Sequence, residues 1–96
     1  MPHYFVLGNW TDQGIRSVKD APKRIDIANE LATKLGGRAE TYVTMGQYDF
    51  VSVLEMPNDD AVMQFALQMG TRGNARSTTL KAWTQGEATK VIAKLP

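Results

Sequence analysis

Asp49-Phe50-Val51-Ser52-Val53-Leu54-Glu55 is the strongest predicted strand of the chain, and the prediction of the fold starts from it. Apolar residues occupy both its odd-numbered and its even-numbered positions, whose side chains point to opposite faces of a strand. This pattern is typical of a strand that is covered on both faces. Residues 38–44 alternate in character and predict a second strand. Because the turn-forming residues Met45-Gly46-Gln47 separate the two strands, the region is expected to be a β-hairpin.

Helices and further strands flank this hairpin on both sides. The other predicted elements are a strand at 3–9, a helix that starts at Asp20-Ala21-Pro22 and ends at Gly36-Gly37, a helix at about 59–69, a strand at 76–83 and a helix at about 86–94. Asp20 is expected to cap its helix with its carboxylate, and one of the two glycines is expected to adopt a positive φ. Pro57-Asn58-Asp59-Asp60 predicts the start of the next helix.

The order of these elements is βαββαβ with an added C-terminal helix. This order predicts an α+β protein with a ferredoxin-like, four-stranded antiparallel sheet and both main helices on one face. The apolar strands at 3–9 and 49–55 are expected in the centre, and the two more polar strands at the edges. With 96 residues, the chain is expected to form one domain over 1–96.

The face of the sheet without helices is also predicted to be apolar. Phe5 and Leu7 lie on the parity opposite to that of Tyr4 and Val6, and Val51 and Val53 extend the same pattern. Soluble monomers rarely expose such a patch. A second copy is therefore expected face to face, as a dimeric α+β barrel or a higher homo-oligomer. Coverage of this face by the C-terminal helix is the other interpretation.

Composition excludes several classes of protein. No apolar run approaches the roughly 18 residues that span a bilayer. Met1-Pro2-His3-Tyr4 lacks the features of a signal peptide, so none is expected. A net charge of +1 does not suit a nucleic-acid binder, and the absence of cysteine removes thiolate chemistry. A cytoplasmic protein without nucleic-acid or membrane partners is therefore expected.

The candidate ligand-binding residues lie at strand ends and in loops. They are Asn9, Trp10, Tyr48, Asp49, Arg72, Asn74 and Arg76. Asn9 and Trp10 are expected either at the rim of a pocket or as a plug beside a helix cap. Tyr48 and Asp49 are interpreted either as ligand contacts or as turn chemistry in which Gly46 has a positive φ.

The loop from Gly70 to Arg76 supports two interpretations. Arginine side chains and free backbone N–H groups predict a weak anion site made of Arg72, Asn74 and Arg76. The same loop also suits a plain connector between a helix and a strand.

Metal and cofactor sites are not expected. His3 is the one histidine, and it is interpreted as a solvated strand start. The methionines Met45, Met56, Met63 and Met69 are interpreted as core residues. No residue stands out as a catalytic nucleophile.

Several of these segments, taken together, resemble the GYD domain family. The segments that carry the resemblance are 8–16, 19–24, 45–49 and 73–80. The family takes its name from the pattern that is present here as Gly46, Tyr48 and Asp49, and the similarity runs over about residues 3–95. The family is grouped with the dimeric α+β barrels and is largely uncharacterised, so the resemblance implies a fold and an assembly but no reaction.

Two functions remain open at this point. The first is a homo-oligomeric small-ligand-binding or structural module, with a small anionic or aromatic molecule as the ligand. The second is a cofactor-independent enzyme, similar to a monooxygenase or an isomerase, that acts on a small organic substrate in the barrel cavity. Its pocket residues are expected to be Asn9, Trp10, Tyr48, Asp49 and Arg76.

Overall fold

The computed structural model describes all of residues 1–96 and contains four strands and four α-helices. In chain order these are β1 (His3–Trp10), α1 (Asp12–Arg16), α2 (Ala21–Lys34), β2 (Arg38–Val43), β3 (Phe50–Glu55), α3 (Asp59–Thr71), β4 (Ala75–Ala82) and α4 (Gln85–Ile92), with a 3-10 turn at Val18–Asp20. The predicted strands agree with these bounds to within one residue, and α3 runs two residues further than predicted.

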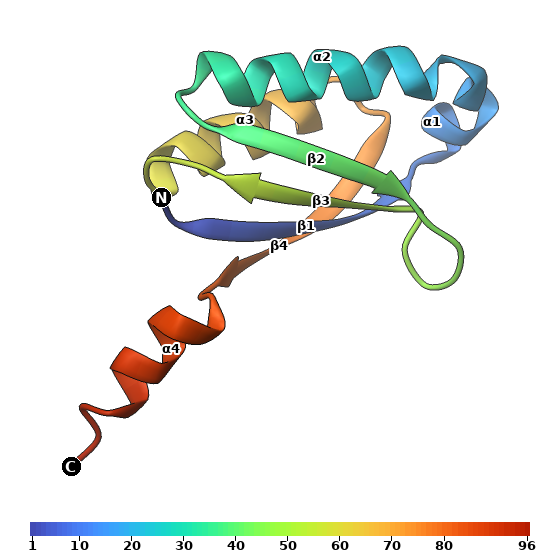
Figure 1. The fold of residues 1–96 in the computed structure, drawn as a ribbon. Helices are drawn as coiled ribbons and strands as arrows, with labels where there is room; N and C mark the ends of the chain where they lie inside the picture. Colours follow the sequence, from blue (N-terminus) through green and yellow to red (C-terminus); the bar gives the residue numbers. More distant parts are fainter.

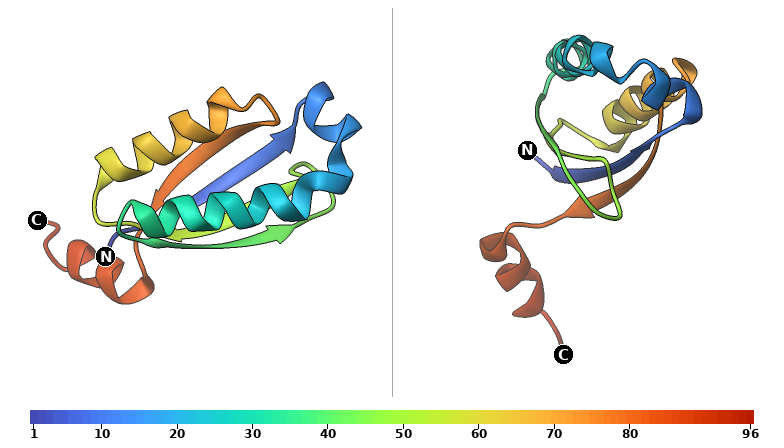
Figure 2. Two further views of the ribbon diagram at one scale, coloured as in Figure 1. Left: turned by 90° about the horizontal axis from the view of Figure 1, so that it is seen from above. Right: turned by 90° about the vertical axis from the view of Figure 1, so that its right-hand side faces the viewer.

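The strands form one antiparallel sheet in the order β2-β3-β1-β4, so the two apolar strands are central as predicted. Figures 1 and 2 show α2 and α3 side by side over one face of this sheet. The α+β ferredoxin-like prediction is thereby confirmed. None of the helices combines the length and the hydropathy that crossing a bilayer requires.

Polar side chains cap three of the helices. Thr11 accepts a hydrogen bond from the Gly14 N–H, and Asn58 accepts one from the Ala61 N–H. Thr84 and Glu87 form a capping box at the start of α4. The prediction that Asp20 caps α2 with its carboxylate is wrong. Asp20 ends a 3-10 turn in helical conformation, so its side chain makes no capping hydrogen bond.

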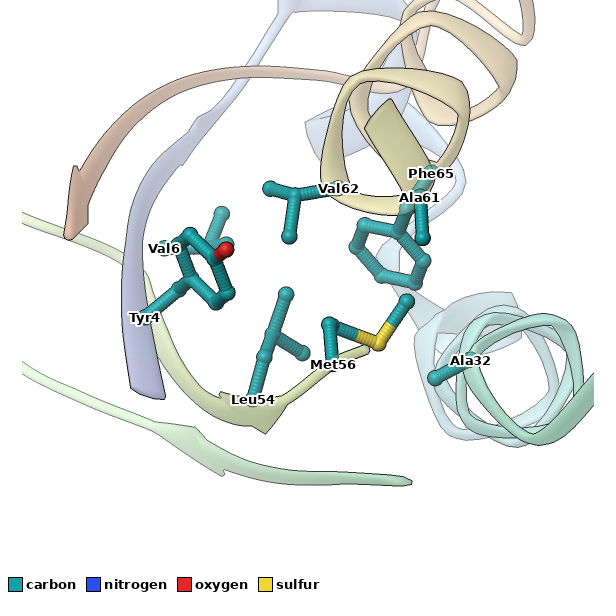
Figure 3. Close-up of a cluster of buried hydrophobic side chains, with 8 residues drawn as sticks. All are labelled: Tyr4, Val6, Ala32, Leu54, Met56, Ala61, Val62 and Phe65. Atoms are coloured by element: carbon teal, nitrogen blue, oxygen red, sulfur yellow. The ribbon is translucent and has the colours of Figure 1, made fainter. Parts of the chain in front are cut away.

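The core lies between the sheet and the two helices that cover it (Figure 3). Its buried cluster is Tyr4, Val6, Ala32, Leu54, Met56, Ala61, Val62 and Phe65. The even-numbered residues of β1 and β3 face these helices because side chains alternate along a strand. Figure 3 shows Leu54 and Met56 between the strands and the side chains of α2 and α3.

Two of the four methionines predicted in the core are not there. Met56 is fully buried and Met69 packs against the core cluster. Met45 is 99% exposed and Met63 is 63% exposed. Met45 lies in the hairpin turn, where no element can cover it, and Met63 lies on the outer side of α3.

The opposite face of the sheet is uncovered within the chain. Phe5 is 37% exposed and Leu80 is 47% exposed on this face. Helix α4 projects away from the sheet (Figures 1 and 2) and contains no buried residue. It therefore does not cover the apolar face, which was one of the two interpretations of the sequence.

Candidate functional site

A cleft of about 500 Å³ lies between α2, α3 and the covered face of the sheet. Its apolar walls include Val6, Ile25, Ala28, Phe50, Phe65 and Met69. Its polar lining includes Arg24, Thr41, Ser52, Arg72, Asn74 and Arg76. A volume of this size and an apolar lining with a few polar groups are typical of sites for small organic molecules.

Trp10 supplies the largest flat surface of the cleft. It is the last residue of β1 and belongs to the parity that faces the helices. Its ring centroid lies 5.0 Å from that of Phe50, and the two ring planes are inclined by 35°. The Trp10 backbone N–H donates to Asp49 Oδ2 over 2.8 Å, which ties the end of β1 to the start of β3. The hydrogen bond to Asp49, a residue of the β2–β3 hairpin, therefore fixes the position of Trp10 beside Phe50.

Arg24 brings a cation to the same aromatic surface. The carbon at the centre of its guanidinium lies 5.5 Å from the Trp10 ring centroid, within the range of cation–π attraction. Its Nη1 donates to Ser17 Oγ over 3.0 Å and its Nη2 donates to the Gly14 carbonyl over 3.1 Å. Its Nε is buried and has no hydrogen-bond partner. Two of the five N–H groups of Arg24 thus make hydrogen bonds within the chain, and the Nε–H is among those that do not.

A hydrogen-bonded corner holds the other polar end of the cleft. The Thr11 N–H donates to the Asn74 carbonyl over 3.1 Å, and Thr11 Oγ1 donates to the Gly73 carbonyl over 2.6 Å. Gln13 Nε2 donates to the Arg72 carbonyl and to Asn74 Oδ1, at 3.1 and 3.0 Å. These bonds join α1 to the connector before β4, and so they fix where Arg72 and Asn74 lie.

Gly14 allows this corner to close. A Cβ at position 14 would lie 1.9 Å from the Asn74 carbonyl oxygen, far inside contact distance. The two motifs at 8–16 and 73–80 therefore meet in space, and their glycine and threonine residues make a structural joint.

The structure gathers four of the seven predicted ligand-binding residues on the cleft. These are Trp10, Arg72, Asn74 and Arg76. Arg76 pairs with Asn9 in the β1–β4 register, so the side chains of both residues project to the helix-free face, although Arg76 borders the cleft and Asn9 does not.

Tyr48 and Asp49 also lie outside the cleft lining. The Asp49 carboxylate is engaged by the Trp10 N–H, and its own N–H donates to the Gly8 carbonyl over 2.8 Å. Gly46 has a φ of 109°, as its turn position predicted. The pocket set expected of a cofactor-independent enzyme is therefore not collected in one place.

Three polar residues of the cleft lining, Arg24, Thr41 and Ser52, are not among the residues that the sequence predicted to bind a ligand. Arg24 lies four residues before Ala28, so helical spacing places both residues on the same face of the helix. This spacing was the sequence feature that could have predicted Arg24 at the cleft. Thr41 and Ser52 are directly opposite each other in the β2–β3 register, and their hydroxyl oxygens are 2.7 Å apart. That pairing depends on strand register, which no local pattern in this chain specified.

The titratable groups with shifted pKa values lie elsewhere, mostly at the opposite end of β1. Burial and a hydrogen bond to Asp59 raise the pKa of Tyr4 to about 12. The pKa of Asp59 is lowered by that hydrogen bond and by Lys81, whose Nζ is 3.0 Å from Asp59 Oδ1. This pair anchors the start of α3 to β1, and it is a structural pair.

His3 belongs to the same end of the sheet. Its Nε2 lies 2.9 Å from Glu55 Oε1, and its side chain is 27% exposed. His3 is thus the first residue of β1, as predicted, but its side chain is only partly exposed because the β1–β3 register brings Glu55 beside it. Arg38 also contacts Glu55 and lowers the pKa of that carboxyl.

Known proteins resemble the chain in sequence and in fold. The model of the GYD domain family matches residues 4–92. The "Glutamine synthetase and cystathionine beta-lyase binding protein" of Thermus thermophilus is 34% identical over 84 residues, which cover 85% of this chain and 88% of that protein.

Solved structures extend the likeness to the fold. The crystal structure of TTHA0845 from Thermus thermophilus has a TM-score of 0.52 at 27% identity, covering 88% of this chain and 95% of that one. The crystal structure of FFRP-DM1 has a TM-score of 0.58 at 20% identity, covering 86% of this chain and all of that one. At 20% identity this second likeness concerns the fold alone.

Proposed function

The chain belongs to the GYD domain family, and from this membership we propose that it is a homodimeric, single-domain module that binds a metabolic enzyme. The relative at 34% identity is named for binding glutamine synthetase and cystathionine beta-lyase. Our proposal transfers the general role, attachment to an enzyme of amino-acid metabolism, to this chain. The observation that carries it is the presence of two apolar surfaces that the chain itself leaves uncovered.

The first surface is the helix-free face of the sheet, and its proposed occupant is a second copy of the chain. Phe5, Leu7, Val51 and Val53 lie on this face at the centre of the sheet, with Leu80 beside them on β4. An isologous pairing of two such faces would bury the same residues twice, as a two-fold axis requires. The result would be a barrel-like interior between two sheets.

The second surface is helix α4, and its proposed occupant is the enzyme. Ala88, Val91 and Ile92 have the spacing i, i+3 and i+4, which places them on one side of α4, and Leu95 follows three residues after the helix ends. Val91 is 53% exposed, Ile92 62% and Leu95 69%. An apolar stripe at this spacing is the form in which helices dock into grooves of partner proteins. The capping box at Thr84 contributes local stability at the start of this helix.

The dimer is tested by the molar mass in solution. Light scattering at micromolar concentration is expected to give twice the chain mass of 10.6 kDa. Leu80→Lys, on β4 beside Phe5 in the proposed interface, is expected to give the monomer, because the charge would be buried without a partner. Met63→Lys places the same charge on the outside of α3 and should leave the dimer intact. A wild-type mass of 10.6 kDa would refute the pairing.

Enzyme binding is tested by surface plasmon resonance with glutamine synthetase from the same organism. Saturable binding in the micromolar range is expected. Ile92→Ser should weaken it about ten-fold or more, equivalent to about 1.4 kcal/mol. Lys90→Gln changes the same helix outside the apolar stripe and is the matched control. Equal affinities for Ile92→Ser and the wild type would show that α4 is not the docking element, and absence of binding would refute this partner.

A further inference from the structure

We propose that the cleft between α2, α3 and the sheet binds a small organic carboxylate, with the carboxylate at Arg24 and Arg72 and the apolar body against Trp10 and Phe50. This site is separate from both surfaces of the proposed function. The cleft opens on the helix-covered face, whereas the proposed dimer uses the other face and the proposed enzyme contact uses α4. Each proposal can therefore fail without the other.

The arginines that line the cleft form no ion pair with a carboxylate of the chain. Arg24, Arg72 and Arg76 all contribute to its lining. None of the three forms an ion pair, since the ion pairs of the structure involve His3, Arg38 and Lys81. The side chain of Arg76 has the same parity on β4 as Leu80 and so projects to the helix-free face. The two unpaired guanidinium groups of Arg24 and Arg72 favour an anion in the cleft, and planar donors favour a carboxylate in particular.

The buried Nε of Arg24 points to the same conclusion. Buried donors are nearly always hydrogen-bonded, so one without a partner calls for an explanation. The two terminal nitrogens of Arg24 already donate to Ser17 and Gly14, which holds the guanidinium in place. Nε is the one nitrogen of the guanidinium with no partner, and Nη1 and Nη2 each keep a second N–H group beyond the bond they make. Because protein atoms cover Nε, a ligand oxygen would reach it only after a small movement of the side chains around it.

The rest of the cleft requires the ligand to have an apolar body. The Trp10–Phe50 pair forms a flat wall, and Ile25, Ala28, Phe65 and Met69 supply aliphatic and aromatic contacts. Acetate or phosphate would satisfy the arginines but leave these walls without a partner. A volume of about 500 Å³ accommodates an arylalkyl carboxylate with space to spare.

The two tryptophans make a clean optical test possible. Trp10 lines the cleft, whereas Trp83 is 55% exposed after the end of β4. In a Trp83→Phe background, a change in tryptophan emission therefore reports on the cleft. The probes are 3-phenylpropionate, its uncharged amide and acetate. We expect saturable binding of 3-phenylpropionate, at least ten-fold weaker binding of the amide, and no saturation with acetate in the same range.

Variants in this background separate the arginines from general charge effects. Arg72→Gln is expected to weaken 3-phenylpropionate binding at least five-fold. Arg24→Lys keeps the charge but removes Nε, and is expected to weaken it similarly. Lys34→Gln removes one charge at the far end of α2, outside the cleft lining, and should bind as the parent does. Circular dichroism and thermal unfolding establish that each variant is folded.

Three results would overturn the proposal. One is equal affinity for the carboxylate and its amide, because the arginines would then contribute nothing. Another is unchanged affinity in both folded arginine variants. The third is the absence of saturable binding of 3-phenylpropionate up to millimolar concentration. Mass measurements on the same samples report independently on the dimer.

Discussion

Replacement of Gly14 by alanine should destabilise the protein strongly although it adds a single methyl group. The new Cβ would lie 1.9 Å from the Asn74 carbonyl oxygen and 2.8 Å from the Asn74 carbonyl carbon. Both atoms belong to the backbone, so no side-chain rotation can relieve the contact. Either α1 or the connector before β4 has to shift to make room for the methyl group.

The magnitude follows from what that movement breaks. Overpacking of a buried site costs about 1–3 kcal/mol. The hydrogen bonds from Thr11 to Gly73 and Asn74 would be stretched, at about 0.5–1.5 kcal/mol each. Alanine in a helix is favoured over glycine by up to about 1 kcal/mol, which offsets part of the loss. A net destabilisation of about 2–4 kcal/mol results.

Thermal unfolding followed by circular dichroism measures this effect. For a domain of this size the expected loss corresponds to a midpoint at least about 10 °C lower. Gly86→Ala is the matched control, because nothing lies within 4 Å of its Cβ and it is in α4. That variant should be unchanged or up to about 1 kcal/mol more stable. An unaltered midpoint for Gly14→Ala would refute the claim that α1 and the connector form a tight joint.

Three further predictions concern the turn, the pH dependence and the core. Gly46→Val should lower the free energy of unfolding by roughly 1–3 kcal/mol, because a valine is strained at a φ of 109°. Nothing lies near the position of the added Cβ, so backbone strain is the sole cost. An unchanged denaturation midpoint would contradict this prediction. The folded-state pKa of Tyr4 is raised from 10.0 to about 12, so the folded state retains the phenol proton more strongly. The associated stability is complete below pH 10 and is lost between about pH 10 and 12. Tyr4→Phe should remove this alkaline loss in chemical denaturation, and identical pH profiles would exclude the mechanism. Leu54→Ala should cost about 2–5 kcal/mol, since Leu54 is fully buried; a loss below about 1 kcal/mol would show that the core collapses around the gap.

Sequence patterns were a good guide wherever one local cause dominates. Hydrophobic parity placed β1 and β3 in the centre of the sheet, because central strands need apolar side chains on both faces. Positive φ was correctly expected at Gly46 and at one glycine of the pair 36–37, because other residues are strained there. Asp20 misled because a capping residue type says nothing about whether its backbone is extended, as a cap requires, or helical.

Amino-acid order alone thus determined the strands, the helices α2, α3 and α4, the antiparallel ferredoxin-like order and the apolar second face, because each follows from side-chain period and backbone preference. The short helix α1 was not among the predicted elements. The tertiary structure decided which residues that are distant in the sequence contact one another. It brought Arg24 over Trp10, joined Thr11 to Gly73, and separated Tyr48 and Asp49 from the cleft. These contacts depend on strand register and on the packing of α2 over the sheet, where a shift of one residue reverses which side chains face inward.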